Sequence, residues 1–184
     1  MALLAGSSVA GIAASGAGAG VATAVPQVDV QALSVLSRPR TEADVIPAGV
    51  APTFSAASGA NVDLSRKVET PNGNAWLVPG TSSLCLVADG GAVCAPAESA
   101  AEGDLAQEGG IGGAGSVKLS EINSAPKEVS GVVPNGVETV TVHLVNGGTS
   151  TLTVHENVYM GVVKGAVSTV TFTGPNGSGS ASFR

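Results

Sequence analysis

The segment TVTVHLVNGGTSTLTVH, residues 139–155, decides the fold class of this chain. On both sides of its Asn-Gly-Gly turn every second residue is apolar, which is the pattern of two β-strands that each bury one face. A three-residue loop at 146–148 would set Val142 opposite Leu152, whereas a two-residue loop would set apolar residues opposite polar ones. The sequence therefore predicts a β-hairpin closed by a three-residue loop.

Similar short patterns recur along the chain at intervals typical of an all-β protein. Asp-Gly and Asn-Gly dipeptides, which suit tight turns, lie between several of them. The predicted strands are 75–79, 84–88, 92–95, 129–133, 137–145, 150–155, 158–163 and 167–173. Helical patterns are short, at 28–36, 41–44 and 98–107.

The predicted fold is mainly β: a small antiparallel β-sandwich or a partly open barrel, with a short N-terminal helix. Aromatic residues make up only 3% of the chain, so Val, Leu and Ile must supply most of the core, and β-branched side chains favour strands. Along the chain we expect a leader at 1–25, a short helix and linker at 26–60, and a β-rich domain at 61–184.

Cys85 and Cys94 are the two cysteines of the chain. If Asp89-Gly90 forms a two-residue turn, counting outward from residues 88 and 91 sets Cys85 directly opposite Cys94, at a separation that suits a disulfide. Such a bond persists in an oxidising compartment, so the prediction is an extracytoplasmic protein, secreted or membrane-anchored. The alternative is a pair of unbonded, buried cysteines in a cytosolic protein.

Residues 2–25 carry no charge and end near the small-residue pattern Ala22-Thr23-Ala24. Such a leader is typical of a signal peptide, here cut after Ala24, or of a membrane anchor through residues 3–25. A signal peptide normally begins with basic residues, and the first Lys or Arg of this chain is Arg38. The alternative interpretation is a flexible Gly/Ala-rich tail.

The charge of the chain excludes one class of partner. Its eight Lys and Arg residues against fourteen Asp and Glu give a formal net charge of −6. Binding to DNA or RNA depends on neutralising phosphates with basic side chains, so we expect no nucleic-acid partner.

No group of residues in the sequence indicates catalysis, a cofactor or a metal. The G-x-G-x-x-G string at 110–115 has neither a buried strand before it nor a helix after it, so it is interpreted as a loop. His143 and His155 are the only histidines, and the predicted hairpin keeps them too far apart to share a metal ion. Glu102 and Asp104 are interpreted as solvated loop charges, and the predicted catalytic, cofactor-binding and metal-binding residues are none.

Several strings occur together in an order that resembles a set of uncharacterised exported or membrane-anchored small β-domain proteins of high-GC bacteria. These strings are a Ser-Arg-Pro helix end, WLVPG at 76–80, LCL followed by a second Cys, and VVPNGVETVTVHL at 132–144. The resemblance covers about Ser37 to Phe172. It implies an anchored or secreted β domain whose function is unassigned, and it transfers no catalytic residue.

Three functions remain open from the sequence. The first is a non-enzymatic extracytoplasmic β domain that acts through protein–protein contacts at the cell envelope, with an unknown protein partner. An exposed strand edge or an apolar patch would favour it. The second is a hydrolase of unrecognised type, which needs a deep pocket holding His143 or His155 beside a buried Asp and a Ser. The third is a ligand-sensing ectodomain.

Overall fold

The protein forms two antiparallel sheets and a few short helices, in a computed structural model that describes residues 22–52, 54, 58–88, 91–110 and 125–183. The smaller sheet has the order β1-β2-β3-β4, and the larger has the order β11-β10-β7-β8-β9-β6-β5. The strands of the smaller sheet are β1 (Arg66–Thr70), β2 (Gly73–Pro79), β3 (Ser83–Ala88) and β4 (Gly91–Pro96). Those of the larger sheet are β5 (Ala106–Gly110), β6 (Pro126–Val132), β7 (Thr139–Leu144), β8 (Thr149–His155), β9 (Val158–Lys164), β10 (Val167–Gly174) and β11 (Gly177–Ser182).

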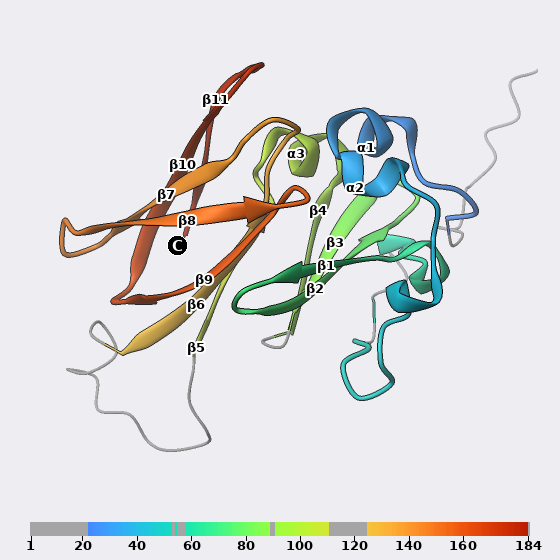
Figure 1. Ribbon diagram of the computed structural model, residues 1–184, viewed down its shortest axis with the longest axis horizontal. Coiled ribbons are helices and arrows are strands. Elements are labelled where there is room, and N and C mark those ends of the chain that lie inside the picture. The colour runs from blue at the N-terminus through green and yellow to red at the C-terminus, as the bar shows by residue number, and fades with distance from the viewer. Residues whose placement is uncertain (1–21, 53, 55–57, 89–90, 111–124, 184) are drawn as a thin grey trace, which may run out of the picture.

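The larger sheet curls into a half-barrel, which confirms the predicted fold class. The α-helices are grouped at one end of the molecule, near the top of Figure 1. They are α1 (Gln27–Ala32), α2 (Ser34–Ser37) and α3 (Ala97–Glu102), and two 3-10 turns, η1 (Glu42–Asp44) and η3 (Val62–Leu64), follow α2 along the chain. The helix predicted at 28–36 is therefore present, but it is divided at Leu33, whose backbone is extended.

The smaller sheet is covered on both faces. Leu77 and Leu86 point to one face, where they pack with Leu33 of the helical segment and with Val132 and Val158 of the larger sheet. The opposite face carries Trp76, Val78, Cys85 and Val87, against which Ile46, Val50 and Phe54 of the N-terminal arm pack. Because both faces are buried, β2 and β3 are almost continuously apolar instead of alternating.

The disulfide between Cys85 and Cys94 is confirmed, with Cα atoms 4.0 Å apart. The register predicted for this hairpin is also confirmed, since Ala88 lies opposite Gly91 and Cys85 opposite Cys94. The turn residues 89 and 90 lie outside the described residues. Closing a loop of about ten residues stabilises the folded chain by roughly 3 kcal/mol in the chain-entropy estimate.

The register predicted for the β7–β8 hairpin is wrong by two residues. Val140, not Val142, lies opposite Leu152, and His143 lies opposite Thr149. The loop does contain three residues, but it occupies 145–147, because Gly147 takes the positive φ of 86° that the last position of such a loop requires. The apolar residues keep their face of each strand, since a shift of two residues preserves it, but Val142 now lies opposite Ser150.

Three strands lay outside the predicted set: β1, β5 and β11. β11 has the sequence GSGSAS, and Gly and Ser are poor strand formers. It forms because it pairs along its whole length with β10, from Gly174 opposite Gly177 to Thr169 opposite Ser182. Its Gly179 is required by packing, since a Cβ atom at this position would collide with the Phe172 ring.

Candidate functional site

The outer edge of β11 carries main-chain groups that lie free of the sheet. Phe183 N donates to Ser168 O at 3.0 Å, so residues 168 and 183 form a hydrogen-bonded pair. Hydrogen-bonded pairs alternate along an antiparallel ladder, so the residues of β11 in phase with Phe183, which are 177, 179 and 181, also bond to β10. The main-chain groups of the residues out of phase, Ser178, Ser180 and Ser182, therefore point away from β10. None of them has a main-chain partner among the described residues.

The outer edge of β5, at the other end of the sheet, is arranged in the same way. Val132 N donates to Leu105 O at 2.9 Å, so residues 105, 107 and 109 direct their main-chain groups toward β6. Those of Ala106 and Glu108 point outward. The larger sheet thus has two unpaired edges, one at each end of its strand order.

Two cavities lie along the edge of β11, and one of them is also lined by β5. One, of about 400 Å³, is lined by 106–108 of β5 and by Ser182 and Phe183. A second, of about 440 Å³, is lined by Glu102 and Asp104, which precede β5, and by 176–180, among other residues. We call the space between these two edges, bordered by residues 102–108 and 176–183, the β5–β11 slot.

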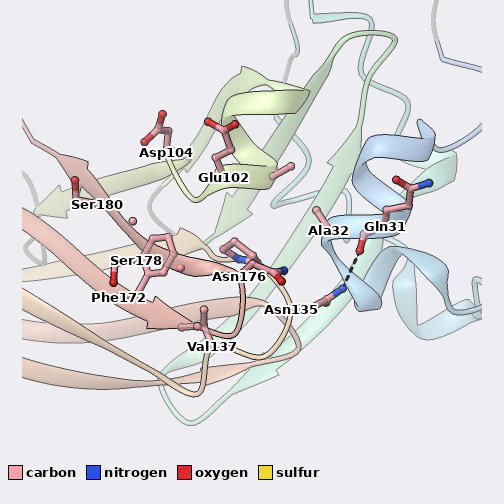
Figure 2. Close-up of a pocket in the computed structure, with 15 residues that line it drawn as sticks. Gln31, Ala32, Glu102, Asp104, Asn135, Val137, Phe172, Asn176, Ser178 and Ser180 are labelled. Carbon is pink, nitrogen blue, oxygen red and sulfur yellow. Dashed lines mark hydrogen bonds between the residues drawn. The ribbon is translucent and has the colours of Figure 1, made fainter.

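Figure 2 shows the larger cavity, with Glu102 and Asp104 on the α3 side and Ser178 and Ser180 on β11. Phe172 forms part of the lining, and its ring is held between two glycines. Both Gly103 and Gly179 lie so close to this ring that a Cβ atom on either would collide with it. Gly103 also ends α3 with a φ of 97°, a conformation that favours glycine, so both its backbone and its contact with the ring require glycine. The contact with Phe172 sets the end of α3 beside β11.

A network of amide side chains fixes the opposite wall of the larger cavity. Asn135 donates from Nδ2 to Gln31 O at 3.0 Å, drawn as a dashed line in Figure 2, and accepts at Oδ1 from Ser34 N at 2.7 Å. Asn157 Nδ2 also donates to Asn135 Oδ1, at 3.0 Å. These bonds join α1 and α2 to the loop after β6, so the wall is preorganised without a ligand.

The slot is acidic. Glu102 and Asp104 are exposed and take part in no ion pair among the described residues. Glu108 is committed to the fold, since it accepts a hydrogen bond from Val167 N at 3.1 Å and lies 3.4 Å from Lys127 Nζ. Among the described residues, no Lys or Arg lines either cavity. The walls thus offer free carboxylates, hydroxyls and main-chain groups, together with one aromatic ring.

The histidines lie apart from the slot. His143 Nε2 is 2.9 Å from Thr171 Oγ1, and His155 ends β8 opposite Val158. His155 lies six residue steps along β8 from Thr149, the partner of His143, which corresponds to about 20 Å along the strand. In the part of the chain that is described, no group of three or more His, Cys, Asp or Glu side chains could hold a metal. The string at 110–115 lies outside the described residues beyond Gly110.

Another polar cavity lies outside the slot and is lined by Arg38, Asp44, Lys67 and Glu156, among others. Its polar groups have a structural role in the N-terminal arm. Asp44 is fully buried, and its carboxylate accepts hydrogen bonds from both Nη atoms of Arg38, from Thr41 N and Oγ1, and from Lys67 N. The capping box predicted at 41–44 is therefore confirmed, and it also ties the N-terminal arm to β1. These groups are already satisfied by one another.

Comparison of the chain with protein-family models, curated proteins and solved structures gave no match. Within the described residues, no helix is long and apolar enough to cross a membrane. The sequence indicated that Glu102 and Asp104 are solvated loop charges, and both are exposed, but Glu102 is the last residue of α3 and only Asp104 lies in the loop before β5. The sequence carried no signal for the cavity beside them. That cavity depends on β11, whose Gly/Ser sequence resembles a loop.

Proposed function

We propose that this protein is a non-enzymatic extracytoplasmic domain that acts through protein–protein contacts at the cell envelope, and that it binds its partner in the β5–β11 slot. The observation that carries the proposal is the row of unpaired main-chain groups at Ser178, Ser180 and Ser182, which border both cavities. An extended chain presents N–H and C=O groups at the same spacing, so a partner can add to β11 as a further strand.

The extracytoplasmic location is supported by the disulfide between Cys85 and Cys94, because such bonds persist mainly in oxidising compartments. In this proposal residues 1–25 deliver the chain, either as a signal peptide or as an anchor, as in the exported β-domain proteins that it resembles. The two forms differ at Ala22, whose N donates to Gly59 O and whose O accepts from Asn61 Nδ2. A cut after Ala24 removes these bonds, whereas an anchored chain keeps them if its membrane segment ends before Ala22.

The expected result for the location concerns the intact mass of the protein from its native host. Both cysteines should resist alkylation until the protein is reduced. A mass that lacks residues 1–24 would indicate a signal peptide, and a full-length protein in the membrane fraction would indicate an anchor. A soluble full-length chain with two free thiols would contradict the proposed compartment.

A proline at position 180 tests the binding edge directly. Residue 180 directs its N–H away from β10, so Ser180→Pro costs no hydrogen bond of the β10–β11 ladder but removes an outward donor and fills the edge. We expect 12-residue peptides selected from a displayed library on the oxidised protein to bind Ser180→Pro about tenfold or more weakly.

The matched variant is Ser180→Ala, which keeps the main-chain N–H and should bind far more tightly than Ser180→Pro. Circular dichroism and urea unfolding check that both variants remain folded. Selected peptides that bind the proline variant as well as they bind the unmodified protein would overturn the proposal. Failure of the library to give any peptide that binds would overturn it equally.

The hydrolase and ligand-sensing alternatives receive no comparable support. Neither His143 nor His155 lines the two cavities of the slot. His143 is close to Thr171 but has no carboxylate partner among the described residues. Binding of an extended chain uses the unpaired edge, which neither alternative explains.

A further inference from the structure

The direction of each side chain along β11 determines what a bound segment would meet. Phe172 points into the half-barrel, and Gly179, its partner in the ladder, faces the same side. A residue of an added strand opposite Gly179 would therefore also point inward. Since Gly179 has no side chain, the inward side chain of the partner would reach the larger cavity beside the Phe172 ring.

The groups that this side chain would meet are acidic. Glu102 and Asp104 flank the same ring through Gly103, which contacts it. Neither carboxylate is neutralised by an ion pair within the described structure, and the remaining polar groups of the lining are amides and hydroxyls. An ammonium or guanidinium group would gain charge-assisted hydrogen bonds here and could also contact the aromatic ring.

We propose that the segment bound along β11 is an extended stretch of another polypeptide that carries a lysine or arginine, and that this basic side chain enters the cavity between Phe172, Glu102 and Asp104. This inference rests on the proposed function, because it specifies the partner of the same slot. The edge from Ser178 to Ser182 spans about 13 Å, the length of roughly five residues of an extended partner. The basic residue is the one opposite Gly179.

A second copy of this chain fits the slot less well. The chain has a net charge of −6, and two copies joined along β11 would each bring Glu102 and Asp104 toward the shared edge. The strand available for such pairing, GSGSAS, carries no basic residue for the cavity. Charge complementarity therefore favours a basic partner of a different sequence.

The test measures binding of the tightest library peptide and of its analogue with the basic residue changed to Gln. The double variant Glu102→Gln with Asp104→Asn should bind the basic peptide about tenfold more weakly, and the loss should shrink at high salt. The analogue lacks the basic group, so it should bind the double variant and the unmodified protein equally well. The change in the peptide and the change in the protein remove the two partners of one charge–charge interaction, so making both costs no more than making one. The matched control is Glu98→Gln with Asp63→Asn, which removes equal charge at exposed residues outside the slot.

The outcomes separate this inference from the proposed function. Peptides that lack a basic residue, or that bind the double variant as they bind the unmodified protein, overturn the basic-partner inference. If Ser180→Pro still abolishes their binding, the slot remains a strand-binding site. Concentration-dependent self-association in sedimentation that Ser180→Pro removes, without binding of any peptide, would assign the slot to a second copy and overturn the inference.

Discussion

Replacing Asp44 by alanine is expected to lower the free energy of unfolding by about 3 kcal/mol, the low end of the cost of breaking a buried ion pair, because the Arg38 side chain is 31% exposed. The carboxylate of Asp44 is buried and receives hydrogen bonds from Arg38, Thr41 and Lys67 N. Its removal leaves the Arg38 guanidinium and the main-chain N–H of Lys67 without their acceptor. The measurement is the urea midpoint of unfolding at pH 7.

The control for this prediction is Glu42→Ala in the same 3-10 turn, because Glu42 is exposed. It should change the midpoint little. Burial alone would raise the pKa of Asp44, but the bonds from Arg38, Lys67 N and Thr41 outweigh this effect and hold the pKa well below its ordinary value. The contribution of Asp44 to stability should therefore persist at pH 5 and be lost only as the pH falls below about 4. Equal midpoints for the two variants would contradict this account of the arm.

The stability of the protein is expected to increase as the pH falls from about 7 to about 4, because of Asp29. This residue of α1 is fully buried, and neither carboxylate oxygen has a hydrogen-bond partner among the described residues. Desolvation by burial raises the pKa of Asp29 from 3.8 to about 6. Above pH 6 the folded protein holds an uncompensated charge, which costs about 3 kcal/mol. Between pH 6 and 4 the folded state binds the proton that the unfolded state still lacks, so stability rises with acidification.

Asp29→Asn removes this titration while keeping the size of the side chain. We expect the variant to be about 2–3 kcal/mol more stable than the unmodified protein at pH 7.5, with the difference vanishing near pH 4. Asp63→Asn, at an exposed position, is the matched control. The Asp44 effect falls in a lower pH range, so urea unfolding measured at half-unit intervals from pH 4 to 8 separates the two residues. Parallel pH profiles for Asp29→Asn and the unmodified protein would show that the buried charge is compensated.

The sequence predicted those elements whose side chains alternate and whose turns have a strong preference. The Cys85–Cys94 hairpin could be predicted by counting residues, because the pairing runs without a bulge from Ala88 opposite Gly91 to Cys85 opposite Cys94. The β7–β8 register failed because NGG allows two positions for a three-residue loop, and only the positive φ of Gly147 distinguishes them. Local composition could not distinguish these positions.

The candidate site was beyond prediction for a different reason. β11 forms a hairpin with β10, but its Gly/Ser sequence lacks the alternation of a strand, and its Gly179 is explained only by the Phe172 ring that lies over it. Glu102 and Asp104 were predicted to be solvated charges, and both are exposed. Their position beside Ser178 depends on the packing of Gly103 against the Phe172 ring. Tertiary packing therefore creates the slot from segments that resemble loops.

The most direct measurement of the central claim is residue-level hydrogen exchange along β11, with and without a bound library peptide. In the free protein the amides of Ser178, Ser180 and Ser182 should exchange rapidly, while those of Gly179 and Ala181, bonded to β10, are protected. We expect the bound peptide to protect the amides of all three serines. A peptide that binds but leaves all three serine amides exchanging rapidly would contradict the addition of a strand to this edge.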